Sequence, residues 1–195
     1  MKFFKKIFKK VIGFSEEEIK QQNVVLSLDD SFVHNFIKRG GKFLYCINKE
    51  DVTSNIQRIL KENEWDTIAY INTHLSRYIP SIKIHKDVSF NSSIPFFTTC
   101  ESLIAEDGSI LFSECQLKDH KLASLTNDFI VFATTSQIVK SKGESLTGIK
   151  IKYKKNIPAN ISSINNFEVG TDNDNFLNYG TTNSKNLYLL LLEDL

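Results

Sequence analysis

The sharpest chemical feature of the sequence is a short acidic turn, Glu106-Asp107-Gly108-Ser109. A carboxylate at the end of a strand, beside such a turn, can act as a nucleophile, which makes Glu106 the candidate catalytic residue. Its neighbours Asp107, Gly108 and Ser109 are candidate ligand-binding residues. The alternative is that the four residues only form a hairpin turn, because glycine after aspartate favours a tight turn. Glu101 lies on the same extended segment and is expected to face away from Glu106.

Two small polar loops near the C-terminus are candidates for binding an anion. Such loops expose backbone N–H groups and hydroxyls that can hold phosphate or carboxylate, and Lys185 can supply a positive charge. The alternative is that they are ordinary turns and helix caps, since neither has the spacing of a phosphate-binding or dinucleotide-binding motif. The candidate residues are Gly170, Thr171 and Asp172 in the first loop, and Gly180, Thr181, Thr182 and Asn183 in the second.

The histidines and cysteines give no sign of a metal site. No two of the histidines, His34, His74, His85 and His120, are three or four residues apart. The three cysteines are widely spaced, which argues against a disulfide framework and against zinc or an iron–sulfur cluster bound by this chain. We therefore expect reduced, mostly buried thiols in a cytoplasmic protein.

Strand and helix character alternates along the first part of the chain, which is typical of a parallel sheet covered by helices. Asn48 is suited to cap one of the helices, and Gly40-Gly41 is suited to end another. The expected elements are a helix over 29–38, a strand over 42–47, a helix over 49–63, a strand over 67–71 and a short helix over 73–78.

The second part is richer in short extended segments. The apolar run 187–192 is expected to be a buried parallel strand. Residues 149–153 fit either an edge strand or the tail of a helix. The other expected elements are strands over 82–84, 88–91 and 96–99, a hairpin pairing Ser102–Ala105 with Ser109–Phe112, a helical turn within 117–124, a central strand over 128–133, and helices over 136–140 and 174–179.

Composition and charge bound the class of protein. The chain has 195 residues, with 24 Lys and Arg against 23 Asp and Glu. A net charge of +1 gives no general attraction to nucleic acid. No apolar run reaches the ~18 residues that a transmembrane helix needs. The length fits one domain, expected over 26–195, with an N-terminal appendage over 1–25.

The N-terminal segment 1–14 (MKFFKKIFKKVIGF) has apolar residues at helical spacing and lysines on the other face. One interpretation is a helix that lies on an anionic membrane surface. The other is a partly ordered tail.

The order of features from the hairpin onward resembles the LUD (lactate-utilisation, LutC-like) family. In that family a hairpin reads approximately A-E-T-G-T-L-V, followed by a polar link, an apolar strand, two glycine-containing loops and a final apolar strand. Residues 105–111 (AEDGSIL) match the hairpin, and residues 125–133 (LTNDFIVFA) match the link and strand. Residues 168–174 and 179–186 stand where the two loops would fall. The resemblance covers residues 85–195 by motif and the preceding part by pattern only.

The resemblance implies a fold like the sugar-phosphate isomerase and CoA-transferase group (NagB/RpiA/CoA-transferase-like). This is an α/β fold with a mostly parallel sheet, helices on both faces and an antiparallel hairpin insertion. It also implies a role in oxidising L-lactate to pyruvate beside partner proteins that carry iron–sulfur clusters. It transfers no catalytic residue. The first loop lacks the family's Arg, the second lacks its His and Pro, and Asp107 replaces the hairpin Thr, so an anion pocket there would lack its expected cation.

Three hypotheses follow. The first is a non-cluster subunit or accessory protein of lactate oxidation that binds a small anion or an iron–sulfur partner. The second is an enzyme acting on an acyl-CoA or a sugar phosphate through Glu106. The third is a catalytically silent interaction domain. The missing Arg and His favour the first and third. A functional site at these motifs requires the acidic turn and the two polar loops to converge at the carboxyl edge of one sheet.

Overall fold

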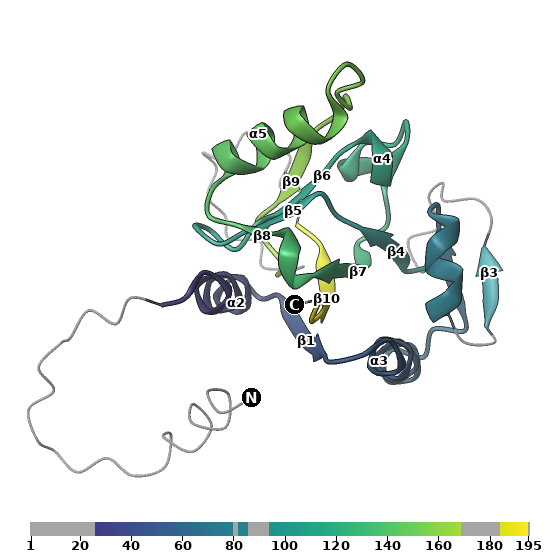
Figure 1. Ribbon diagram of the computed structural model, residues 1–195. Helices are drawn as coiled ribbons and strands as arrows, with labels where there is room; N and C mark the ends of the chain where they lie inside the picture. The colour runs from purple at the N-terminus through teal and green to yellow at the C-terminus, as the bar shows by residue number, and fades with distance from the viewer. Residues whose placement is uncertain (1–25, 80–81, 86–93, 169–183, 195) are drawn as a thin grey trace, which may run out of the picture.

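The structure, a computed structural model, describes residues 26–79, 82–85, 94–168 and 184–194 (Figure 1). Its larger sheet is built from β1 (Lys42–Cys46), β2 (Thr67–Tyr70), β3 (Lys83–His85), β4 (Phe96–Thr99), β7 (Asp128–Thr134) and β10 (Asn186–Leu192). The six strands have the order β1-β10-β7-β4-β2-β3, and every neighbouring pair is parallel. The sequence-based prediction of a parallel α/β sheet is therefore confirmed.

Strand β10 contributes apolar side chains to both faces of the larger sheet. β10 lies between β1 and β7, and Leu189 is in register with Val131 of β7. Alternate residues of β10 point to opposite faces, so Leu187 and Leu189 pack into one apolar cluster while Tyr188 and Leu190 pack into the other. Both faces of the sheet are thus buried, as the apolar run predicts.

Helices cover both faces. On one face, α2 (Leu28–Lys38) buries Phe32 and Phe36 completely, and Ser27 caps it by accepting a hydrogen bond from the Asp30 N–H. The other face is covered by α3 (Lys49–Glu62) and the 3₁₀ helix η1 (Thr73–Tyr78). The Asn48 side chain caps α3, as the sequence predicts.

A smaller sheet packs beside α2. It has the order β8-β5-β6-β9 and consists of β5 (Ser102–Ile104), β6 (Ile110–Phe112), β8 (Ile138–Val139) and β9 (Ser162–Ile164). β5 and β6 are antiparallel, which confirms the predicted hairpin. The outer side of this sheet carries the short helix α4 (Glu114–Leu117) and the longer α5 (Lys142–Tyr153) (Figure 1). The remaining short helix is η2 (Leu122–Ser124).

One predicted helix is wrong. Residues 136–140 do not continue as a helix, because η3 (Thr135–Gln137) ends after one turn and β8 pairs with β5. The buried side chain of Ile138 explains the change, since it contributes to the core from an extended position.

The undecided segment 149–153 is the end of α5, which begins at the cap residue Ser141. The predicted strand over 88–91 and helix over 174–179 lie outside the described residues. Among the described residues, no helix has the length and apolar character needed to cross a bilayer.

Candidate functional site

The polar residues that the fold gathers most tightly surround Glu101, at the carboxyl end of β4. In parallel α/β sheets this edge is where ligands bind. Cys100 and Glu101 follow β4 directly, and η3 follows the neighbouring strand β7. The site is therefore built where two central strands end.

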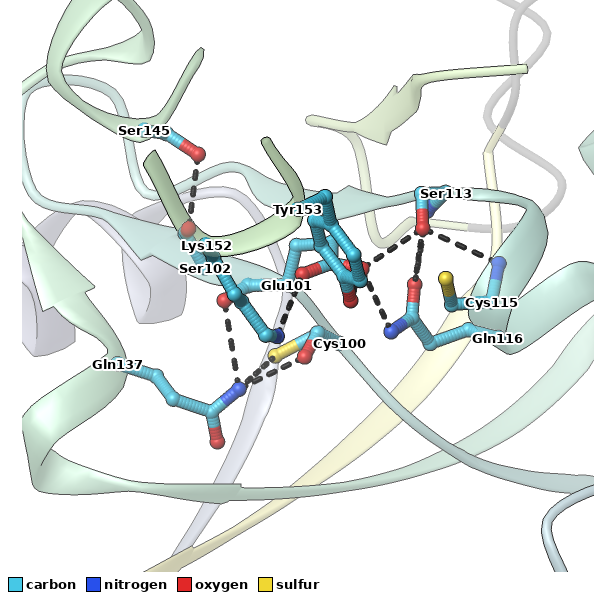
Figure 2. Close-up of polar contacts among 10 residues, drawn as sticks. All are labelled: Cys100, Glu101, Ser102, Ser113, Cys115, Gln116, Gln137, Ser145, Lys152 and Tyr153. Carbon is cyan, nitrogen blue, oxygen red and sulfur yellow. Dashed lines mark hydrogen bonds and ion pairs between the residues drawn. The ribbon is translucent and has the colours of Figure 1, made fainter. Parts of the chain in front are cut away.

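Glu101 accepts hydrogen bonds from four side chains (Figure 2). Its Oε1 atom accepts from Ser113 Oγ at 2.7 Å, Tyr153 OH at 2.9 Å and Gln116 Nε2 at 3.0 Å. Its Oε2 atom accepts from the Lys152 ammonium at 3.1 Å. The side chain of Glu101 is 1% exposed, whereas that of Lys152 is 60% exposed.

This environment keeps Glu101 ionised. Burial by itself would raise the pKa of the carboxyl group, but the hydrogen bonds from Ser113, Gln116, Tyr153 and Lys152 outweigh it, and the pKa lies below its ordinary value. Burial and the adjacent Cys115 and Glu101 raise the pKa of Tyr153, so its hydroxyl remains a donor. A carboxylate whose oxygens are occupied by four donors is a poor nucleophile and a strong structural anchor.

The four donors to Glu101 are held in place by the ends of two helices. Ser113 and Gln116 form a capping box at the start of α4, in which the Ser113 N–H donates to Gln116 Oε1 at 2.8 Å. Lys152 and Tyr153 end α5, and that helix is fixed to β5 by Ser145 Oγ, which donates to Ser102 Oγ at 2.7 Å. Glu101 thus joins the end of β4 to both α4 and α5.

Gln137 connects this cluster to β7. Its Nε2 donates to the Cys100 carbonyl at 2.7 Å, and its Oε1 accepts from the Thr134 N–H at 2.9 Å. The Cys100 thiol is buried, and burial together with Glu101 raises its pKa, so it remains a protonated, unreactive thiol.

A crevice of about 340 Å³ opens beside the cluster. Glu101, Ser136, Gln137, Ser145, Gly148 and Lys152 are among the residues that line it. A side chain added at Gly148 would meet open space, because no heavy atom lies within 4 Å of the position of its Cβ. The lysine ammonium has three donors, and Lys152 is largely exposed, so it has donors left for a further partner while it stays bonded to Glu101. Glu144 also lines the crevice, which therefore contains two carboxylates and one ammonium group.

Glu106, the candidate catalytic residue, lies elsewhere. It lines a groove of about 610 Å³ with Leu26, Asn35 and Lys140, whereas Glu101 lines the crevice described above. The two carboxylates therefore line different cavities, and Glu106 lies in the turn that follows β5, not on an extended segment. The Glu106 backbone N–H donates to the Lys140 carbonyl at 3.0 Å.

The neighbours of Glu106 form a tight turn. Asp107 Oδ1 accepts from the N–H of Ser109 at 2.9 Å and also from its hydroxyl. Asp107 pairs with Lys142 at 3.1 Å. Burial would raise the pKa of Asp107, but these partners lower it. Gly108 has φ +69°, and a Cβ there would lie 2.5 Å from the backbone of α2. The turn residues thus have defined structural partners.

Lys185 is also engaged inside the protein. It is 2% exposed, its ammonium donates to the Leu125 carbonyl at 2.9 Å, and it lies 5.5 Å from the centre of the Phe129 ring. Burial lowers its pKa. Lys185 directly precedes β10, so it lies at the amino end of that strand, and the predicted place at the carboxyl edge of the sheet is wrong for this residue. The other candidate residues, Gly170, Thr171, Asp172, Gly180, Thr181, Thr182 and Asn183, lie outside the described residues, so their place stays a prediction.

Sequence reasoning missed the donors around Glu101. The spacing of Ser113 and Gln116 is a capping-box pattern and could have located α4. Lys152 and Tyr153 could not be placed while 149–153 fitted either a strand or a helix. Within the described part of the chain, no group of three or more His, Cys, Asp and Glu residues is arranged to hold a metal ion.

The structure is similar to a solved structure of a DUF162 family protein from Deinococcus radiodurans, and DUF162 is the LUD-domain family. The TM-score is 0.59, the identity is 13%, and the match covers 86% of this chain and 99% of the other. No family model and no curated protein sequence matches the chain. At this identity the similarity defines the fold, an α/β architecture shared with a LUD-domain protein.

Proposed function

We propose that the chain is a LUD-type accessory protein that works with iron–sulfur proteins in the oxidation of L-lactate to pyruvate. The observation that carries the proposal is the fold similarity, which extends over 99% of a DUF162 family protein. The hairpin that resembles the LUD motif, residues 105–111, forms the antiparallel insertion that the resemblance implies. Because the Glu101 carboxylate already accepts hydrogen bonds from four side chains, a binding role is favoured over catalysis by this carboxylate.

The crevice beside Glu101 is the proposed site for a small anionic ligand such as lactate or pyruvate. Lys152 would attract the carboxylate. Ser136 and Gln137 would form the wall of the site, since their polar groups are bonded to Asp194 and to Cys100 and Thr134. Its place at the carboxyl edge of β4 and β7 agrees with where ligands bind in such sheets.

Co-purification tests the proposal directly. The full chain is expected to bring down an iron–sulfur protein from cells grown on L-lactate, and adding it to that protein is expected to increase lactate-dependent reduction of a dye. No association and no effect on lactate oxidation would reject the accessory role. The third hypothesis, an interaction domain unrelated to lactate, predicts a partner without iron–sulfur clusters.

The ligand site has its own test. Lactate and pyruvate should raise the melting temperature of the wild type, because a ligand that binds only the folded state stabilises it. Gly148→Leu, which extends a side chain into the open space beside the crevice, should remove this shift. Ile37→Leu, at an exposed position of α2, is the control and should retain it.

The alternative enzyme is supported by one observation: Glu106 lines a groove large enough for part of a substrate, about 610 Å³. Incubation with acyl-CoA esters and sugar phosphates would reveal turnover. If Glu106 is the nucleophile, Glu106→Gln abolishes that turnover while Glu114→Gln does not. Equal turnover in both variants removes Glu106 from the reaction.

A further inference from the structure

The end of α5 and the segment after it form a surface of concentrated positive charge. Residues 145–167 contain four lysines and no acidic residue, although the whole chain has a net charge of only +1. The ammonium group of Lys152 is bonded to Glu101. The other three lysines, Lys150, Lys154 and Lys155, are exposed.

Large apolar side chains protrude from the same surface. Ile151 is 68% exposed, Ile157 is 50% exposed and Leu146 is 40% exposed. Because Ser145 and Ile149 are the buried residues of α5, the helical spacing places Ile151 on its outer face with Lys150 beside it. Lys154 directly follows the helix as its C-cap residue and is exposed. Figure 1 shows α5 on the outside of the small sheet.

We propose that this surface, made by Leu146, Lys150, Ile151, Lys154, Lys155 and Ile157, binds an anionic lipid bilayer. Lysines near a membrane surface are attracted to acidic head groups, and exposed isoleucines can enter the boundary between head groups and acyl chains. The combination of both residue types, exposed on α5 and on the segment directly after it, distinguishes this surface from an ordinary solvated helix. The inference does not depend on the proposed role in lactate oxidation.

The position where residue 26 enters the domain supplies a second argument. Leu26 lines the same groove as Ser141, the cap residue of α5. The described domain therefore begins near the start of α5, and residues 1–14, which precede it in sequence, have the same combination of lysines and large apolar residues. Stable binding of a peripheral protein usually requires two such signals.

The composition favours a lipid surface over an acidic protein partner. Protein interfaces are enriched in aromatic residues and arginine and depleted in lysine. Their strongest contacts lie in packed pockets. Here the charges are all lysines and the apolar side chains protrude, which suits a soft, charged surface.

Vesicle sedimentation of the full-length chain tests the proposal. Binding is expected to vesicles that contain phosphatidylglycerol, to be weak on pure phosphatidylcholine, and to fall as salt screens the charges. The double variant Lys150→Gln/Lys154→Gln should bind roughly 25-fold more weakly, at about fivefold per lysine. Ile151→Asp should also weaken binding.

Matched variants on other elements serve as controls. Lys38→Gln/Lys61→Gln removes two exposed charges from α2 and α3, and Ile37→Asp changes an isoleucine that is 53% exposed. Both should bind nearly as the wild type does. Equal losses in the control and α5 variants would overturn the proposal, as would wild-type binding in the α5 variants.

Two further outcomes are decisive. If Lys5→Gln/Lys6→Gln removes all binding while the α5 variants have no effect, only the N-terminal segment contacts lipid and the proposal fails. If the wild-type chain does not bind vesicles but loses a protein partner when the α5 lysines are replaced, the proposal fails and the surface recognises an acidic protein instead.

Discussion

At the scale of single residues, the central feature is a buried carboxylate that is fully used by its neighbours. Glu101 has a side chain that is 1% exposed, and each of its oxygens accepts at least one hydrogen bond. Removing the charge would leave the donors Ser113, Gln116 and Tyr153 with a weaker acceptor. The stability of the junction between β4, α4 and α5 should therefore depend on this one group.

Glu101→Gln should lower the free energy of unfolding by about 2–4 kcal/mol, because hydrogen bonds to a charged group are stronger than neutral ones and the new amide adds donors where acceptors are needed. Urea unfolding followed by circular dichroism measures the change. Glu106→Gln, at an exposed position, should stay within about 0.5 kcal/mol of wild type. Similar losses in both variants would contradict the anchor role.

The Glu101 carboxylate should also make the free energy of unfolding depend on pH. The pKa values of Glu101 and Asp107 are lowered in the folded protein, so their contribution is complete above the ordinary values of 4.5 and 3.8. It is lost as the pH falls through the folded-state values, because the unfolded chain then binds protons more readily. Urea midpoints measured from pH 6 downward should fall below about pH 4.5. The decline should be shallower in Glu101→Gln, and an identical decline would contradict this.

At the scale of elements, the hairpin between β5 and β6 depends on a glycine. Gly108 has a positive φ, and its Cα faces the backbone of Asn35 and Phe36 in α2. Asn35 of α2 also holds the turn in place, because its side-chain Nδ2 donates to the Ala105 carbonyl at 2.8 Å. The turn therefore holds the small sheet against α2.

Gly108→Ala should destabilise the protein by about 2–4 kcal/mol, from backbone strain and from the displacement of α2. The matched change Gly148→Ala should stabilise it by about 0.5–1 kcal/mol, because that glycine lies within α5 and its Cβ position is open. Thermal unfolding of both variants provides the comparison. A tolerated alanine at 108 would show that α2 and the hairpin separate easily.

Elements were predictable from sequence where periodicity and turn residues agree. The Asp107-Gly108 turn, the Asn48 cap and the apolar run of β10 all predicted the observed structure. The helix predicted over 136–140 was wrong because β8 is only two residues long and forms by pairing with β5, which is remote in sequence. The helical state of 149–153 was undecidable because Lys and Ile alternate there, while the deciding contacts of α5 come from Ser102 and Glu101.

At the scale of the whole molecule, the parallel sheet was predictable but its centre of polar chemistry was not. Strand and helix alternation indicates the architecture without naming which strand ends meet. The Glu101 cluster combines residues from 101 to 153, and only the folded arrangement of β4, α4 and α5 brings them together. The motif at Glu106 is visible in the sequence because its four residues are consecutive.

The boundary proposed between residues 25 and 26 predicts that the domain is independent. Both apolar clusters that the structure describes are made by residues after 26, so deleting residues 1–25 should leave one cooperative unfolding transition with an unchanged midpoint. Scanning calorimetry of the full and shortened chains tests this. A lower midpoint would mean that the N-terminal segment packs on the domain.

The position of β10 affects how the protein can be made. A nascent chain that has not yet reached residue 186 has no strand to join β1 to β7, because β10 occupies the place between them. The facing edges of β1 and β7 therefore keep unpaired backbone groups until β10 is made, and unpaired edges of this kind are prone to aggregate. A premature stop shortly before residue 186 should therefore give insoluble protein, and the sheet should be completed only when translation is nearly finished.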